Sequence, residues 1–105
     1  MLNKRFLRIS VLVFLFLLIV NSASFADRGI VAKEHNGKCA ISYNMGSLLV
    51  EWYGGHVASE GDVYVGNFST YGLKELYCLN VDSTSRFWIE DFMASEDDAW
   101  EFLYD

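Results

Sequence analysis

"IVAKEHNGKCAISY", residues 30–43, carries the clearest β-hairpin pattern in the sequence. At its centre lies Asn36-Gly37, a dipeptide that readily adopts the left-handed torsions of a two-residue type I′ hairpin turn. On both sides of the dipeptide, apolar and polar residues alternate with a period of two, as they do in half-buried β-strands. The stretch therefore predicts two antiparallel strands joined by a tight turn.

The same alternation continues to about residue 91, with turn residues at short intervals and no segment of helical period. Short, strongly twisted strands leave unpaired edges unless the sheet closes on itself. We therefore expect a mainly β fold: an antiparallel meander of about five to six strands that closes into a small barrel of the SH3-like or OB-like (oligonucleotide-binding) type.

The C-terminal segment changes to a helical period. Ser95, followed three residues later by Asp98, forms a capping box at a helix N-terminus. This pattern predicts one short α-helix over about residues 96–104. Because so short a helix is marginal on its own, we expect Trp100 and Leu103 to be buried over one open end of the barrel.

The N-terminal segment is typical of a secretory signal peptide. Three basic residues precede an apolar run at residues 11–20, which is too short for a bilayer-spanning helix of about 20 residues. We expect a signal peptide over residues 1–26, cleavage near Ala26, and one barrel domain over residues 27–105 in a secreted or periplasmic protein. The alternative is an uncleaved anchor, and the polar residues directly after the run argue against it.

Charge restricts the class of partner. Residues 27–105 hold five Lys and Arg against fourteen Asp and Glu, a net charge of −9. Nucleic acids and anionic membranes are bound through basic side chains, so both are disfavoured, and no stable membrane insertion is expected after cleavage. A basic protein partner is favoured.

The two cysteines, Cys39 and Cys78, would both enter an oxidising compartment. An even number of cysteines in a small exported chain predicts a disulfide, which would stabilise the fold by roughly 4 kcal/mol on the chain-entropy model. Together with His35 and His56 they are also possible zinc ligands, but their spacing lacks the close pairs of structural zinc sites. We expect no metal and no cofactor.

Aromatic residues are abundant: thirteen Trp, Tyr and Phe follow residue 26, more than we expect a small core to enclose. Alternation places Val63 and Val65 inside the barrel and their neighbours outside. The candidate binding surface consists of Tyr53, His56, Tyr64, Phe68 and Tyr71. The alternative is that outward aromatics form cross-strand pairs that only stabilise the sheet.

The loop sequence "VEWYGGHVASEGD", residues 50–62, is explained mainly as a connection between strands, since glycines flank it. His56 has carboxylates near it in sequence, but no nucleophile or oxyanion motif accompanies it, so no catalytic residue is assigned. Asn67 begins an N-x-S glycosylation acceptor, which matters only in a eukaryotic source.

These features predict an acidic binding module that recognises a basic protein, as an inhibitor or an immunity-like protein does. The first alternative is a small-ligand or saccharide binder that uses the aromatic platform. The second is a minimal hydrolase that uses Glu51, Asp62 or His56, although charged residues that alternate with core residues are the ordinary solvent face of a strand.

Overall fold

The computed structural model describes residues 26–105 of the chain. The predicted signal peptide, up to residue 25, lies outside the described residues. Within residues 26–105, the only helix is far shorter than a bilayer-crossing segment, and no helix there meets the length and hydropathy of a membrane span.

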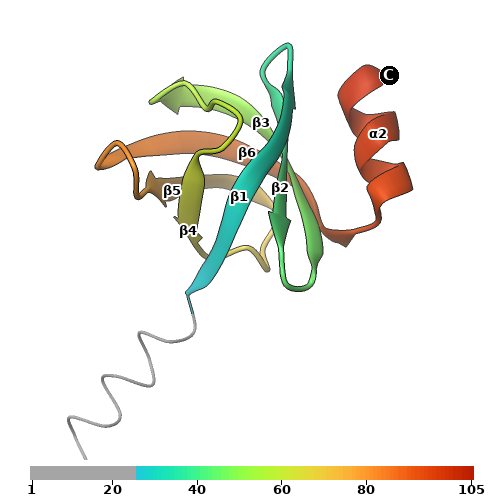
Figure 1. The fold of residues 1–105 in the computed structure, drawn as a ribbon, viewed down its shortest axis with the longest axis horizontal. Helices are drawn as coiled ribbons and strands as arrows, with labels where there is room; N and C mark the ends of the chain where they lie inside the picture. Colours follow the sequence, from blue (N-terminus) through green and yellow to red (C-terminus); the bar gives the residue numbers. More distant parts are fainter. Residues whose placement is uncertain (1–25) are drawn as a thin grey trace, which may run out of the picture.

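Six strands form one closed barrel, in which every neighbouring pair is antiparallel (Figure 1). The elements are β1 (Asp27–His35), β2 (Lys38–Tyr43), β3 (Gly46–Gly55), β4 (Val63–Gly66), β5 (Gly72–Cys78), β6 (Ser83–Ala94) and α2 (Glu96–Tyr104). The predicted fold class is confirmed: a mainly β, closed antiparallel barrel with one short C-terminal helix, consistent with an SH3-like or OB-like barrel.

The strands follow the order β1-β2-β3-β6-β5-β4 around the barrel. The chain thus forms two three-stranded meanders, β1-β2-β3 and β4-β5-β6, which join where β3 pairs with β6 and β4 pairs with β1. The segment between β3 and β4, residues 56–62, carries the chain from one meander to the other. This segment is the second part of the stretch 50–62 singled out in the sequence, and residues 50–55 of that stretch belong to β3.

The β1–β2 hairpin has the predicted turn. Asn36 and Gly37 both have positive φ, 51° and 84°, as a type I′ turn requires. His35 pairs directly with Lys38 across the turn. The dipeptide therefore sets the register in which β1 and β2 alternate their side chains between the interior and the outside.

Inward side chains from all six strands fill the barrel. Seven of these inward side chains are fully or almost fully buried: Cys39, Ile41, Val50, Leu76, Cys78, Phe87 and Ile89. Tyr64 and Phe68, which were expected on the surface, are 0% exposed and belong to the same core. The ring of Tyr64 meets that of Phe87 edge-on with centroids 5.1 Å apart, and Phe68 meets Tyr43 edge-on at 5.2 Å.

Tyr64 is buried because the inward-pointing positions of β4 are the opposite of those predicted. Asp62 is buried just before the strand, so the next inward position is Tyr64, and Val63 and Val65 are only half-buried. After the strand, Phe68 covers Gly29, where a side-chain Cβ would come within 3.2 Å of the Phe68 ring. The missing side chain of Gly29 thus leaves room for the Phe68 ring.

The helix begins where the sequence predicts, because the backbone N–H of Asp98 donates to Oγ of Ser95 at 3.1 Å. Its position differs from the expected one. Ala99 and Leu103 pack on Ala40 and Leu49, which face outward from β2 and β3. The helix therefore lies along the side of the barrel (Figure 1), and Trp100, expected to be buried, is 49% exposed.

Candidate functional site

Three large apolar side chains are exposed on the outer face of β3, β6 and β5. Tyr53 is 56% exposed, Leu73 49% and Trp88 41%. Leu73 lies directly opposite Trp88 in the β5–β6 register. The rings of Tyr53 and Trp88 stack, with centroids 6.3 Å apart and planes 25° apart. We call Tyr53, Leu73 and Trp88 the aromatic face.

Carboxylates surround the aromatic face. Glu51 pairs with Trp88 in the β3–β6 register, and Glu90 follows Trp88 by two residues on the same side of β6. Glu75 lies opposite Arg86, with Oε1 and Nη2 3.9 Å apart. Among residues 26–105, this is the only contact within 4 Å between a carboxylate and a Lys or Arg, so the rim has an excess of negative charge.

The candidate residues from the sequence do not form one surface. Tyr53 belongs to the aromatic face, and Tyr71 is exposed beside Phe92, with ring centroids 4.8 Å apart. His56 is half-buried in the loop, while Tyr64 and Phe68 lie inside the barrel. Sequence reasoning missed Leu73 and Trp88. The sequence does contain a signal for Trp88. Side chains alternate between the two faces of a strand, and both of its neighbours on β6 point inward, so Trp88 must point outward.

A second group of side chains gathers where β3 and β5 end and β4 begins. His56, Asp62, Cys78 and Asn80 form this group, which we call the polar cluster. Nε2 of His56 lies 2.9 Å from Oδ2 of Asp62, and the same oxygen accepts the backbone N–H of Ser59 at 3.0 Å. The side-chain amide of Asn80 donates to Oδ1 of Asp62 at 3.2 Å.

These contacts determine the ionisation of Asp62. Burial alone would raise the pKa of its carboxyl group. The hydrogen bonds from Ser59, His56 and Asn80 outweigh that effect, so the pKa lies below its ordinary value. Asp62 is therefore an ionised acceptor that holds the β3–β4 loop in place at neutral pH.

Further hydrogen bonds hold the backbone of the same loop. The carbonyl oxygen of His56 accepts the indole N–H of Trp52 at 3.0 Å and the hydroxyl of Ser85 at 2.5 Å. The hydroxyl of Tyr64 lies 2.6 Å from that of Ser85. The indole of Trp52, the carbonyl of His56 and the hydroxyls of Ser85 and Tyr64 are thus joined by hydrogen bonds. These bonds attach the loop firmly to the interior of the barrel.

The arrangement does not form the carboxylate pair of a glycosidase. Glu51 lies on the outer face of β3, whereas Asp62 is buried in the polar cluster and already accepts three hydrogen bonds. The two carboxylates therefore do not flank one cleft, as glycoside hydrolysis requires. The loop connects the two meanders and positions His56 and Asp62.

The predicted disulfide is absent from the structure, in which Cys39 and Cys78 are both buried as free thiols. Cys39 lies on β2 and Cys78 on β5, with two strands between them in either direction around the barrel. Facing sheets lie about 10 Å apart, while a disulfide needs Cα atoms about 4.4–6.8 Å apart. Two inward cysteines on opposite walls cannot pair without movement of the strands.

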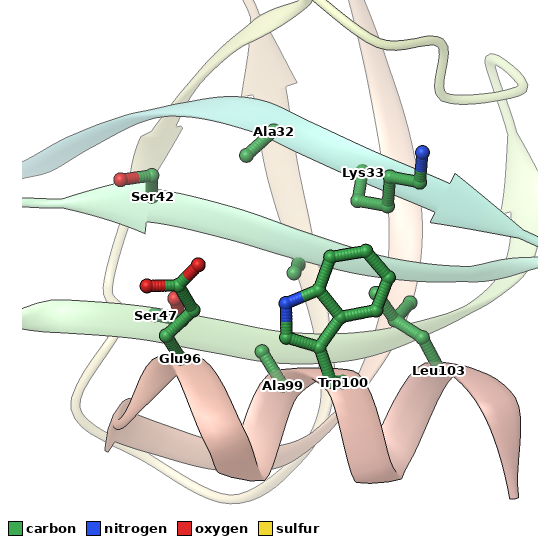
Figure 2. A pocket seen from close by; sticks show the side chains of 9 residues that line it. Ala32, Lys33, Ser42, Ser47, Glu96, Ala99, Trp100 and Leu103 are labelled. Atoms are coloured by element: carbon green, nitrogen blue, oxygen red, sulfur yellow. The ribbon is translucent and has the colours of Figure 1, made fainter.

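A groove of about 340 Å³ lies between α2 and the outer surface of β1, β2 and β3 (Figure 2). The ring of Trp100 forms one wall, with Nζ of Lys33 5.9 Å from its centroid, and Glu96 lies nearer the start of the helix. Small side chains form the floor: Ala32, Ala40, Ser42, Ser47 and Ala99. The groove is thus an open, partly polar pocket beside an exposed indole.

No protein-family model, curated protein or solved structure matches this chain. The aromatic face, the polar cluster and the groove are the features of residues 26–105 that bear on function.

Proposed function

We propose that this chain is an exported, acidic binding module that docks a basic protein through the aromatic face. The observation that carries the proposal is the stacked pair of Tyr53 and Trp88, exposed on a rigid sheet and bordered by carboxylates. Export is supported by the basic residues and the short apolar run near the N-terminus.

Tyrosine and tryptophan are the residues that most often dominate binding energy at protein interfaces, because they bury a large area at a small cost in side-chain entropy. Tyr53 and Trp88 are already stacked before binding, and their strands are part of a closed sheet. The face is therefore preorganised, which lowers the entropic cost of association.

The charge of the rim selects the partner. Glu51, Glu75 and Glu90 border the face, and two basic residues lie in the same rows of the sheet. Arg86 is opposite Glu75, and Lys38 is opposite Glu51 with its Nζ donating to the carbonyl oxygen of Phe102. A negative rim accelerates association with a positive surface and disfavours acidic partners. A basic enzyme that is inhibited, or a basic toxin that is neutralised, fits this surface.

Affinity capture from the cells that make the protein tests the proposal. The wild type should retain a basic protein, and a Tyr53→Ser, Trp88→Ser double variant should lose at least about tenfold in affinity, as expected when hot-spot residues are removed. Trp100→Ser is the matched control, since it removes an equally exposed indole from α2 and should retain the partner. Equal capture by the double variant and the wild type would refute the proposal.

The groove supports a second candidate function, the binding of a small ligand or saccharide. Its volume of about 340 Å³ is within the usual range for ligand pockets, and Trp100 offers a face on which a sugar ring can stack. The tryptophan fluorescence of the wild type should then change on titration with cell-wall saccharides, and that response should disappear in Trp100→Leu. An unchanged response in the variant would exclude this site.

A further inference from the structure

We propose that the polar cluster binds a zinc ion through Nε2 of His56, Oδ2 of Asp62 and Sγ of Cys78. These three atoms lie within 4.8 Å of one another. Imidazole nitrogen, carboxylate oxygen and thiolate sulfur are the three donor types that zinc uses in proteins. This site is independent of the aromatic face.

The separation between the ligand atoms of His56 and Asp62 is close to that at a tetrahedral ion, and Sγ of Cys78 lies within 4.8 Å of both. Two ligand atoms that are each about 2.0–2.1 Å from zinc lie roughly 3.3 Å apart, and the present distance from Nε2 of His56 to Oδ2 of Asp62 is 2.9 Å. A displacement of a few tenths of an ångström along the loop therefore opens the pair for a metal. The side chain of His56 is 26% exposed, which leaves a route from solvent to the open fourth position.

The surrounding hydrogen bonds orient the ligands. The carbonyl of His56 is held by Trp52 and Ser85, and the carboxylate of Asp62 is held by Ser59 and Asn80. In metalloproteins such outer contacts fix ligand geometry and raise metal affinity. Apart from Cys78, the ligands and their supports are thus arranged before the ion arrives.

Zinc binding requires that the ligand atoms of Cys78 and His56 carry no proton. The thiol of Cys78 donates to Oδ1 of Asn80 at 3.6 Å, and the same oxygen accepts the N–H of Val63 at 2.8 Å. When zinc binds, Cys78 releases its proton to solvent, and the proton with which Nε2 of His56 donates to Asp62 leaves that nitrogen, so that His56 coordinates as the neutral imidazole with its remaining proton on Nδ1. Asn80 keeps its contact with Val63, so the loss of the thiol proton leaves no unpaired buried donor.

Cys39 does not compete for the ion. Its strand, β2, is separated from β5 by two strands in either direction around the barrel, and its thiol is not one of the ligand atoms that lie within 4.8 Å of one another. Spacing along the chain argues against a metal for the set Cys39, Cys78, His35 and His56, and that set does not include Asp62. Closure of the barrel brings β5 beside β4 and so places Cys78 next to the loop.

Titration of the purified metal-free protein with zinc and with cobalt(II) tests the proposal. We expect one ion per chain and, with cobalt, the charge-transfer absorption that a thiolate ligand produces. Cys78→Ser should abolish that absorption, and Cys78→Ser and His56→Gln should each weaken zinc binding by at least about tenfold. His35→Gln is the matched control, because it removes the other histidine and should leave both readouts unchanged.

Circular dichroism of each variant shows whether it is folded before titration. Zinc affinity of the wild type should also rise with pH, because binding displaces protons. Wild-type protein that binds no stoichiometric zinc, or that binds cobalt without thiolate absorption, overturns the proposal whatever the variants do. Zinc bound equally by wild type and Cys78→Ser overturns it as well.

Discussion

Nε2 of His56 lies 2.9 Å from Oδ2 of Asp62, and this contact ties the loop that crosses between the two meanders to the interior of the barrel. His56 directly follows the last residue of β3, and Asp62 directly precedes the first residue of β4. The pair therefore controls both the parity of β4 and the position of the loop.

Asp62→Asn should reduce the free energy of unfolding by about 1–3 kcal/mol near pH 7, because it removes a charged acceptor from a buried network. The pKa of Asp62 is lowered in the folded protein, although burial opposes this, by the hydrogen bonds of Ser59, His56 and Asn80. The stabilisation is thus complete above the pKa of the unfolded state and is lost as the pH falls below about 4.

Urea unfolding of wild type and Asp62→Asn at neutral and at acidic pH measures this effect. The difference between the two proteins should shrink towards zero in acid. A difference that is the same at both pH values would mean that the carboxylate charge does not stabilise the loop.

Phe68→Ala should destabilise the protein by about 3–5 kcal/mol, because the side chain is fully buried beside Tyr43 and Gly29. Tyr71→Ala is the comparison, since Tyr71 is 64% exposed and should lose less than about 1 kcal/mol. Thermal or urea unfolding distinguishes them. Similar losses from the two substitutions would contradict the burial of Phe68.

Both cysteines should be free and unreactive in the folded protein. Cys39 and Cys78 are buried, and the raised pKa of Cys39, about 12, keeps it protonated at neutral pH. A thiol reagent should therefore modify neither cysteine until the protein is unfolded and then modify both. Mass spectrometry that finds the chain lighter by two hydrogens would show a disulfide and require a different packing of β2 against β5.

Ser95→Ala should cost about 1 kcal/mol, because Oγ of Ser95 accepts the N–H of Asp98 in the first turn of α2. The helix is only nine residues long and is attached through Ala99 and Leu103. Hydrogen exchange of α2 should become faster than that of the barrel strands. Unchanged protection of α2 would show that packing alone holds the helix.

Local signals predicted much of the fold. The turn at Asn36-Gly37 and the helix at Glu96–Tyr104 depend on backbone torsions and capping that neighbouring residues determine. The alternation rule gave the wrong inward face for β4, because both faces of this strand carry apolar residues. Alternation could not decide between Val63 and Tyr64, and the buried hydrogen bonds of Asp62 settle the choice through contacts distant in sequence.

The sites were harder to predict, because they depend on which strands become neighbours. Trp88 meets Leu73 and Tyr53 only after β6 has paired with both β5 and β3. Cys78 reaches Asp62 only because β4 and β5 are adjacent. The even number of cysteines predicts a disulfide, but Cys39 and Cys78 lie on opposite walls, and that location follows from the strand order.

Chemical-shift mapping by NMR of the labelled protein with its captured basic partner shows whether the aromatic face is the binding surface. The largest changes should occur at Tyr53, Leu73 and Trp88, and the affinity should fall as salt screens the carboxylate rim. Changes confined to α2 and its groove, with the aromatic face unaffected, would contradict binding through that face.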